Sequence, residues 1–245
     1  MAAVSSLGST FNTTAGTKSV TATPAVNDLI VIITGATSTG SADETTAPTD
    51  NNSSGTYSKI VVGQSGSNLG RLIGWVRTAL IPSAVSTVFT YNPLVGTNTG
   101  GGLQVLKVTG MSRTGLSAIL QSANQNSQTA GTTPAPVFGV AVNTVNPVIG
   151  AVMNASNPAA LTPRSSPAYT ERTDVGYATP TTGRETMTID SGETATTITW
   201  GGTSPTLFGD IVMELTIAAP AGGGPLIDGG ELRNGVLIRG GRLVA

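Results

Sequence analysis

The stretch at positions 28–34, Asp-Leu-Ile-Val-Ile-Ile-Thr, holds five consecutive apolar residues, four of which are β-branched. A strand with a single buried face alternates apolar and polar residues, and this stretch does not alternate. It is also too short for a membrane span or a convincing buried helix. We therefore expect a strand that is covered on both sides, or that is central in one sheet of a sandwich, with the rest of the chain wrapped around it.

The composition fits a β protein with an uncharged surface. Of the 245 residues, 38 % are hydrophobic, which is enough for a substantial core, and only 10 % are charged. An ordinary soluble domain has about 25 % charged residues. The surface must therefore be covered by Thr, Ser, Asn, Gln and Gly, and Thr suits a half-exposed strand. Such a surface also fits, more weakly, a protein that is packed in an assembly.

Several function classes are disfavoured by residues that the chain lacks. The net charge is −1, so no basic field attracts nucleic acid or acidic lipid. The chain has no Cys and no His, which removes disulfides, thiolate metal sites and the usual general base. A Ser nucleophile would have neither a His partner nor a Gly-x-Ser-x-Gly turn. We expect a non-enzymatic protein with no cofactor, no nucleic-acid partner and no membrane insertion.

Short strand-like segments recur along the chain, separated by Gly, Pro, Asn and Ser. We expect strands at 17–23, 28–34, 57–62, 71–80, 86–91, 103–109, 137–142, 148–153, 169–178, 185–190, 194–200 and 210–218. A short helix competes with a strand at 115–124, and 35–55, 96–102 and 121–133 are expected as loops or turns. In the last strand, Ile211, Met213 and Leu215 should share one face, opposite Val212 and Glu214. The pattern predicts an all-β, antiparallel β-sandwich of the jelly-roll or concanavalin-like type, without fixing the strand order.

We expect three parts: an extended N-terminal arm at 1–16, the sandwich at 17–219, and a Gly-rich linker with a C-terminal arm at 220–245. The first residues lack the features of a secretory signal, so synthesis in a host cytoplasm without a signal peptide is expected. In the C-terminal arm, Gly-Leu units recur every five or six residues and are too short to bury a leucine alone. Subunit contacts are therefore expected from Leu226, Leu232, Leu237, Leu243, Arg233, Arg239 and Arg242. A disordered tail is the alternative.

The acidic residues offer weak candidates for a site. The turn at 190–193, Asp-Ser-Gly-Glu, could hold calcium, but ordinary hairpin chemistry is favoured because most oxygens of a calcium shell are missing. Glycosidase chemistry requires two carboxylates across a cleft, for which Glu171 with Asp174, or Glu185 with Asp190, could be nominated. These acids are thinly spread and lie in no recognisable motif, so solvated surface charges are the favoured interpretation.

The aromatic residues separate into two groups by their neighbours. Trp75 and Trp200 lie on expected strands among apolar residues, which favours core packing. Tyr169 and Tyr177 have polar flanks that indicate partial exposure, and an exposed aromatic ring can stack on a sugar. We therefore hold Tyr169 and Tyr177 as candidate glycan contacts.

Three stretches carry a family resemblance: 27–32 (Asn-Asp-Leu-Ile-Val-Ile), 74–80 (Gly-Trp-Val-Arg-Thr-Ala-Leu) and 87–91 (Thr-Val-Phe-Thr-Tyr). With them, the chain over 17–218 resembles concanavalin-like or jelly-roll β-sandwich modules in structural proteins of tailed bacteriophages. The part from 179–183 to 198–201 is similar to uncharacterised phage virion proteins. Strand and turn patterns of this kind recur in many sandwiches.

The resemblance implies a role at the virion surface, as a capsid decoration or cement protein, a head fibre or a tail-fibre appendage, commonly as a homotrimer. Its implied partners are further copies of this chain and other virion proteins such as the major capsid protein. The family has no catalytic residues to carry over. The alternative function is a receptor- or carbohydrate-binding module of a tail appendage, whose partner would be a host surface glycan. A polysaccharide-degrading enzyme is a third hypothesis, and it requires two facing carboxylates in a groove.

Overall fold

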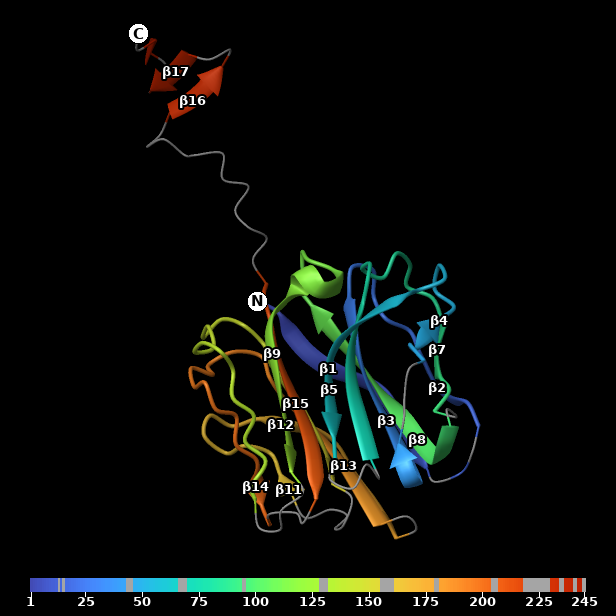
Figure 1. Cartoon of the computed structure of the whole chain (residues 1–245). Helices are drawn as coiled ribbons and strands as arrows, with labels where there is room; N and C mark the ends of the chain where they lie inside the picture. The colour runs from blue at the N-terminus through green and yellow to red at the C-terminus, as the bar shows by residue number, and fades with distance from the viewer. Residues whose placement is uncertain are drawn as a thin grey trace.

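Figure 1 shows the computed structural model of the chain, which describes residues 1–12, 14, 16–42, 46–65, 70–93, 96–127, 132–154, 161–178, 181–203, 207–217, 230–233, 236–239 and 242–243. These residues form two five-stranded antiparallel sheets, three smaller sheets, and one short 3-10 helix, η2 (Gly115–Ala118). The predicted all-β antiparallel sandwich is confirmed.

The sandwich consists of a first and a second sheet that pack face to face (Figure 1). The first sheet has the order β1 (Ala3–Asn12), β8 (Gly96–Thr109), β3 (Leu29–Ala42), β6 (Gly70–Arg77) and β5 (Tyr57–Gln64). The second sheet has the order β12 (Thr170–Ala178), β13 (Thr181–Ile189), β10 (Val148–Asn154), β15 (Phe208–Leu215) and β9 (Ile119–Ser127).

Strand β3 contains the five apolar residues that dominate the sequence, and both of its faces are covered. Leu29, Val31 and Ile33 point into the core between the two sheets. Ile30 and Ile32 point the other way, into a second core beneath a small three-stranded sheet. This small sheet consists of β2 (Lys18–Ala22), β7 (Thr87–Tyr91) and β4 (Thr49–Asp50). All five apolar residues of β3 are completely buried, so the prediction of a strand covered on both sides is confirmed.

The outer face of the second sheet is covered by loops, not by another sheet. We call the residues 132–147, 161–169 and 190–202 the loop cover. Within it, the short strand β11 (Leu161–Thr162) pairs with β14 (Gly201–Gly202). Phe138, Tyr169 and Trp200 of the loop cover pack on Val152 and Val212 of the second sheet in a third core. The fold is therefore layered as small sheet, first sheet, second sheet and loop cover.

The expected alternation in β15 is confirmed. Ile211, Met213 and Leu215 lie in the core between the sheets, whereas Val212 lies in the core beneath the loop cover. Near this strand the two sheets come unusually close, because Gly63 of β5 faces β15. A Cβ atom on Gly63 would lie 2.8 Å from the Asp210 carbonyl oxygen, and one on Gly209 would overlap the backbone of Gln64.

The N-terminal segment differs from the expected arm. Ala3–Asn12 forms β1, an edge strand of the first sheet that pairs with β8 from Thr109 to Gly101. Ala2 and Val4 are buried in the core between the sheets. The boundary at position 17 was therefore placed too late, since at least residues 2–12 belong to the sandwich.

Several loop boundaries also differ from expectation. The segments 96–102 and 35–42, expected as turn and loop, extend β8 and β3 and pair with each other through a register shift. Residues 115–124 contain both of the competing structures, η2 followed by β9. The expected strands at 137–142 and 194–200 are irregular backbone in the loop cover, with an isolated β-bridge between Val137 and Thr197. Further backbone hydrogen bonds join these segments, such as that from Phe138 N–H to the Thr196 carbonyl at 2.8 Å.

The C-terminal arm has some regular structure of its own. The strands β16 (Gly230–Arg233), β17 (Val236–Arg239) and β18 (Arg242–Leu243) form a three-stranded antiparallel sheet. Leu232 pairs in register with Leu237, and Leu243 with Ile238. The predicted contact residues Leu232, Leu237, Leu243, Arg233, Arg239 and Arg242 lie on these strands, whereas Leu226 lies outside the described residues.

Candidate functional site

The turn at 190–193 has a structural role, because its two carboxylates turn to different partners. Asp190 accepts a hydrogen bond from the Val4 backbone N–H at 2.7 Å and so joins the second sheet to β1. Glu193 is buried in the loop cover. Among the described residues, no three acidic side chains gather in a way that could hold a metal ion. The hairpin interpretation is favoured over calcium.

Glu193 joins two segments of the loop cover, 161–169 and 190–202, to each other. Its Oε2 atom accepts a hydrogen bond from the Tyr169 hydroxyl at 3.0 Å and forms an ion pair with Arg164 Nε at 3.1 Å. Its Oε1 atom accepts hydrogen bonds from the backbone N–H groups of Thr194 and Ala195. Burial, and then the neighbouring Glu193 carboxylate, raise the pKa of Tyr169, so its hydroxyl remains a donor.

An equivalent cluster fastens the small sheet on the opposite side of the sandwich. Asp50 accepts a hydrogen bond from the Tyr57 hydroxyl at 2.7 Å and forms an ion pair with Arg77 Nε at 2.9 Å. The backbone N–H of Asn52 donates to the second oxygen of Asp50. Burial and the Asp50 carboxylate raise the pKa of Tyr57 well above its ordinary value. Each outer layer thus contains a cluster of a carboxylate, a tyrosine and an arginine.

Of the nominated glycosidase pairs, the structure separates Glu185 from Asp190 and brings Glu171 and Asp174 to the same sheet edge. Asp174 is the register partner of Glu185, and a bulge in β12 places Glu171 opposite Met187, so three acids gather at one sheet edge. Asp190 turns away to Val4 and does not pair with Glu185. Glu185 is only 3 % exposed, which leaves it inaccessible to a polysaccharide chain.

Among the acids that the structure describes, Glu185 and Asp210 have raised carboxyl pKa values. Burial, followed by the charges of Glu171 and Asp174, raises the pKa of Glu185 to about 8. Burial raises the pKa of Asp210 to about 8 as well, although the Gln125 N–H donates to one of its oxygens at 2.8 Å. Such shifts mark functional sites only when the group lies in a cleft, and both carboxyls are enclosed.

The burial of the aromatic residues differs in part from what the sequence predicts. Tyr169 is 7 % exposed and donates to Glu193, so the expected exposed, sugar-stacking role of Tyr169 is wrong. Tyr177 lies on β12, and its side chain is outside the described part of the chain. Trp75 and Trp200 are both buried, as core packing requires. The Trp75 indole N–H donates to Thr34 Oγ1 at 2.8 Å.

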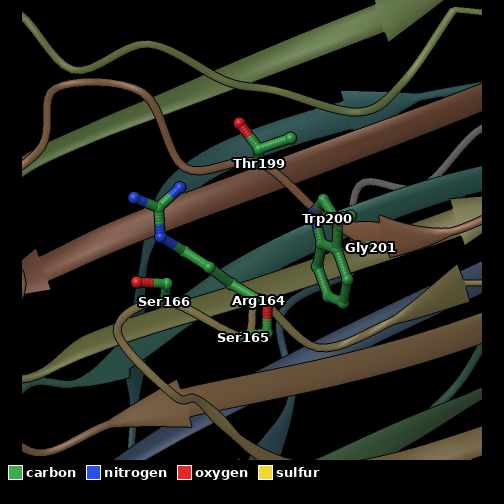
Figure 2. A pocket seen from close by; sticks show the side chains of 6 residues that line it. All are labelled: Arg164, Ser165, Ser166, Thr199, Trp200 and Gly201. Carbon is green, nitrogen blue, oxygen red and sulfur yellow. The ribbon is translucent and has the colours of Figure 1, made fainter.

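A pocket in the loop cover is the strongest candidate for a binding site. It has a volume of about 190 Å³ and is lined by Arg164, Ser165, Ser166, Thr199, Trp200 and Gly201. Figure 2 shows Arg164 and Ser166 on one side of this pocket and Trp200 on the other. None of these residues was singled out as a contact by the sequence, because the two segments that supply them are more than thirty positions apart and neither carries a motif.

Two other hollows are weaker candidates. One is lined by 53–56 and 77–80, but its guanidinium, Arg77, is already committed to Asp50 and to the carbonyls of Asn52, Ala79 and Leu80. The other is largely apolar and is lined by Met1, Val145 and Ile217 with two hydroxyl residues. Neither combines an accessible charge with several hydroxyl groups as the pocket at Arg164 does.

Across the described ranges, no helix has both the length and the apolarity needed to cross a bilayer. Comparison with known proteins gives no relative: no protein-family model, no curated protein and no solved structure matches this chain.

Proposed function

We propose that this chain is a non-enzymatic structural protein of a bacteriophage virion, acting at the particle surface as a capsid decoration, cement or fibre-type protein. The observation that carries the proposal is the use of its buried acids. The carboxylate oxygens of Asp50, Glu193 and Glu214 accept hydrogen bonds that fasten loops to the sandwich. These three carboxylates have structural partners, which supports a scaffold whose outer surfaces make the functional contacts.

The neutral exterior supports the same role. Only 10 % of the residues are charged, so subunits can approach one another without a large desolvation cost for ions. The C-terminal arm adds a small sheet with a leucine or isoleucine on each strand. Burying such side chains against a neighbouring subunit contributes about 25 cal/mol per Å² of apolar surface. In this proposal, the arm clamps copies of the chain into a homotrimer or onto a capsid protein.

The proposal is tested by removing the arm. A chain that ends before Pro225 should form fewer oligomers in light-scattering chromatography and should bind particles more weakly than the full chain. A triple Leu→Ser variant at Leu232, Leu237 and Leu243 should reproduce the defect. The matched control changes Leu116 and Leu120 to Ser, since both are exposed on the sandwich. A truncated chain that assembles and binds particles as well as the full chain contradicts the proposal.

A further inference from the structure

We propose that the pocket between Arg164 and Trp200 binds a single sugar ring that carries a carboxylate, such as a hexuronic acid. The inference goes beyond the scaffold role and does not depend on it. It also moves the glycan contact away from Tyr169, which is buried.

The charge of the pocket selects an anionic group. Arg164 is held in place by its ion pair with Glu193 and by a hydrogen bond from Nη1 to the Thr197 carbonyl at 3.3 Å. Its side chain remains 18 % exposed, and it is the one charged side chain among the residues that line the pocket. Glu193 also accepts hydrogen bonds from Tyr169, Thr194 and Ala195, and its ion pair with Arg164 engages Nε, which leaves Nη2 of the guanidinium for a ligand. A guanidinium on a side chain that is held in place and partly exposed is suited to a carboxylate.

The remaining lining residues select a sugar over a simple ion. Ser165, Ser166 and Thr199 supply three hydroxyls, each able to donate and accept, as the hydroxyls of a sugar require. Trp200 borders the pocket and is 2 % exposed, so it offers the C–H groups of a ring a narrow apolar edge and no open stacking face. Its Nε1 is buried behind the lining and has no hydrogen-bond partner among the described residues. The volume equals that of about six water molecules, more than one small ion needs.

Trp200 provides the readout for the test. The chain has two tryptophans, and the indole N–H of Trp75 is already bonded to Thr34 on the first sheet. In a ¹⁵N-labelled full chain, titration with glucuronate should therefore shift the Trp200 indole resonance in a saturable way and leave that of Trp75 unchanged. The Trp75→Phe variant assigns the two resonances. We expect a Kd of about 1 mM, as for one small ligand with few contacts.

Three ligands separate the possible outcomes. Glucose, which lacks the carboxylate, should bind at least tenfold more weakly than glucuronate. Inorganic phosphate tests for a simple anion site, and phosphate binding as tight as glucuronate binding would overturn the sugar assignment. The absence of a saturable shift with glucuronate at about 20 mM, twentyfold above the expected Kd, would overturn the site altogether.

Two variants test the named residues. Arg164→Gln should weaken glucuronate binding at least tenfold, because a charge-assisted pair is lost. Since Arg164 also pairs with Glu193, a second variant that spares this ion pair, S166A/T199V, carries the test if Arg164→Gln fails to fold. It should weaken binding about fivefold. Its matched control, S19A/T21V on β2, changes two exposed residues of the small sheet and should leave the affinity unchanged. An unchanged affinity in S166A/T199V would overturn the proposal.

Discussion

Glu185 and Asp210 lie on either side of Val152, one on each strand that flanks β10, with all three residues in register on the face beneath the loop cover. Burial raises the pKa of both carboxyls to about 8, so both are protonated at neutral pH. Two neutral carboxyl groups can be buried next to a valine in the apolar core beneath the cover, whereas burying two charged carboxylates there would cost much more free energy.

This arrangement predicts that the protein loses stability as the pH rises from about 4 to about 8. In this window the unfolded chain releases the two protons, since its carboxyl pKa values are near 4, while the folded chain retains them. The free energy of unfolding should fall by up to about 1.4 kcal/mol per pH unit for each group. Below pH 4 and above pH 8 these two groups add no further slope.

Thermal melts between pH 5 and pH 8 check this expectation. E185Q and D210N should each reduce the fall of the melting temperature with pH. The melting temperature of each variant relative to the parent chain should therefore rise as the pH rises. A slope that survives in the E185Q/D210N double variant would show that other groups cause it.

The close approach of the two sheets gives a second prediction. Gly63→Ala and Gly209→Ala should each destabilise the protein by about 1–3 kcal/mol, because the added methyl group meets backbone that cannot move aside. Gly139→Ala is the control, since a Cβ atom there has no neighbour within 4 Å. Urea unfolding measures the difference, and equal midpoints for all three variants would refute the close approach.

The ion pair beneath the small sheet gives a third prediction. Asp50→Asn should cost about 3–5 kcal/mol, because it leaves the buried guanidinium of Arg77 without its anion. Tyr57→Phe, which removes one hydrogen bond to the same carboxylate, should cost about 1 kcal/mol. Asp174→Asn serves as an exposed control and should stay within about 0.5 kcal/mol of the parent. A small effect of Asp50→Asn in equilibrium unfolding would mean that this ion pair adds little.

The first strand gives a fourth prediction. Deleting residues 2–12 should destabilise the sandwich by about 3–6 kcal/mol, since it removes the buried side chains of Val4 and Phe11. It also removes the hydrogen bonds that tie Val4 to Asp190 and Arg172. Differential scanning calorimetry compares this deletion with removal of 218–245. If the N-terminal deletion melted at the temperature of the full chain, the segment would behave as the arm that its composition suggested.

The predictable parts of the fold were those in which burial leaves a local pattern. Ile30 and Val31 are buried on opposite faces, so an unbroken apolar run was a reliable sign of a strand in the middle of three layers. Strand β1 gave no such sign, because it lies at a sheet edge and buries few side chains. The glycines at 100–102 looked like a turn, yet a Cβ on Gly102 would overlap the backbone of Thr10. There glycine permits close packing inside a strand.

The candidate pocket was out of reach of the sequence for a different reason. Arg164 lies in a segment rich in Pro, Ala and Ser, and Trp200 lies in what looked like a strand. Their proximity depends on how two irregular segments fold over the second sheet, and that path is fixed by the long-range bonds of Glu193 to Tyr169 and Arg164. Local composition carries no trace of such contacts.

The pairing of Ala3 with Thr109 has a consequence for biogenesis. A ribosome adds about 5–20 residues per second, so β1 waits roughly 5–20 s for its neighbour β8 to emerge. The two strands that flank β10 in the second sheet arrive later still. Nascent chains of this protein therefore expose the unpaired edge of β1 until β8 has been synthesised, and neighbouring chains on one polysome can pair wrongly in this interval.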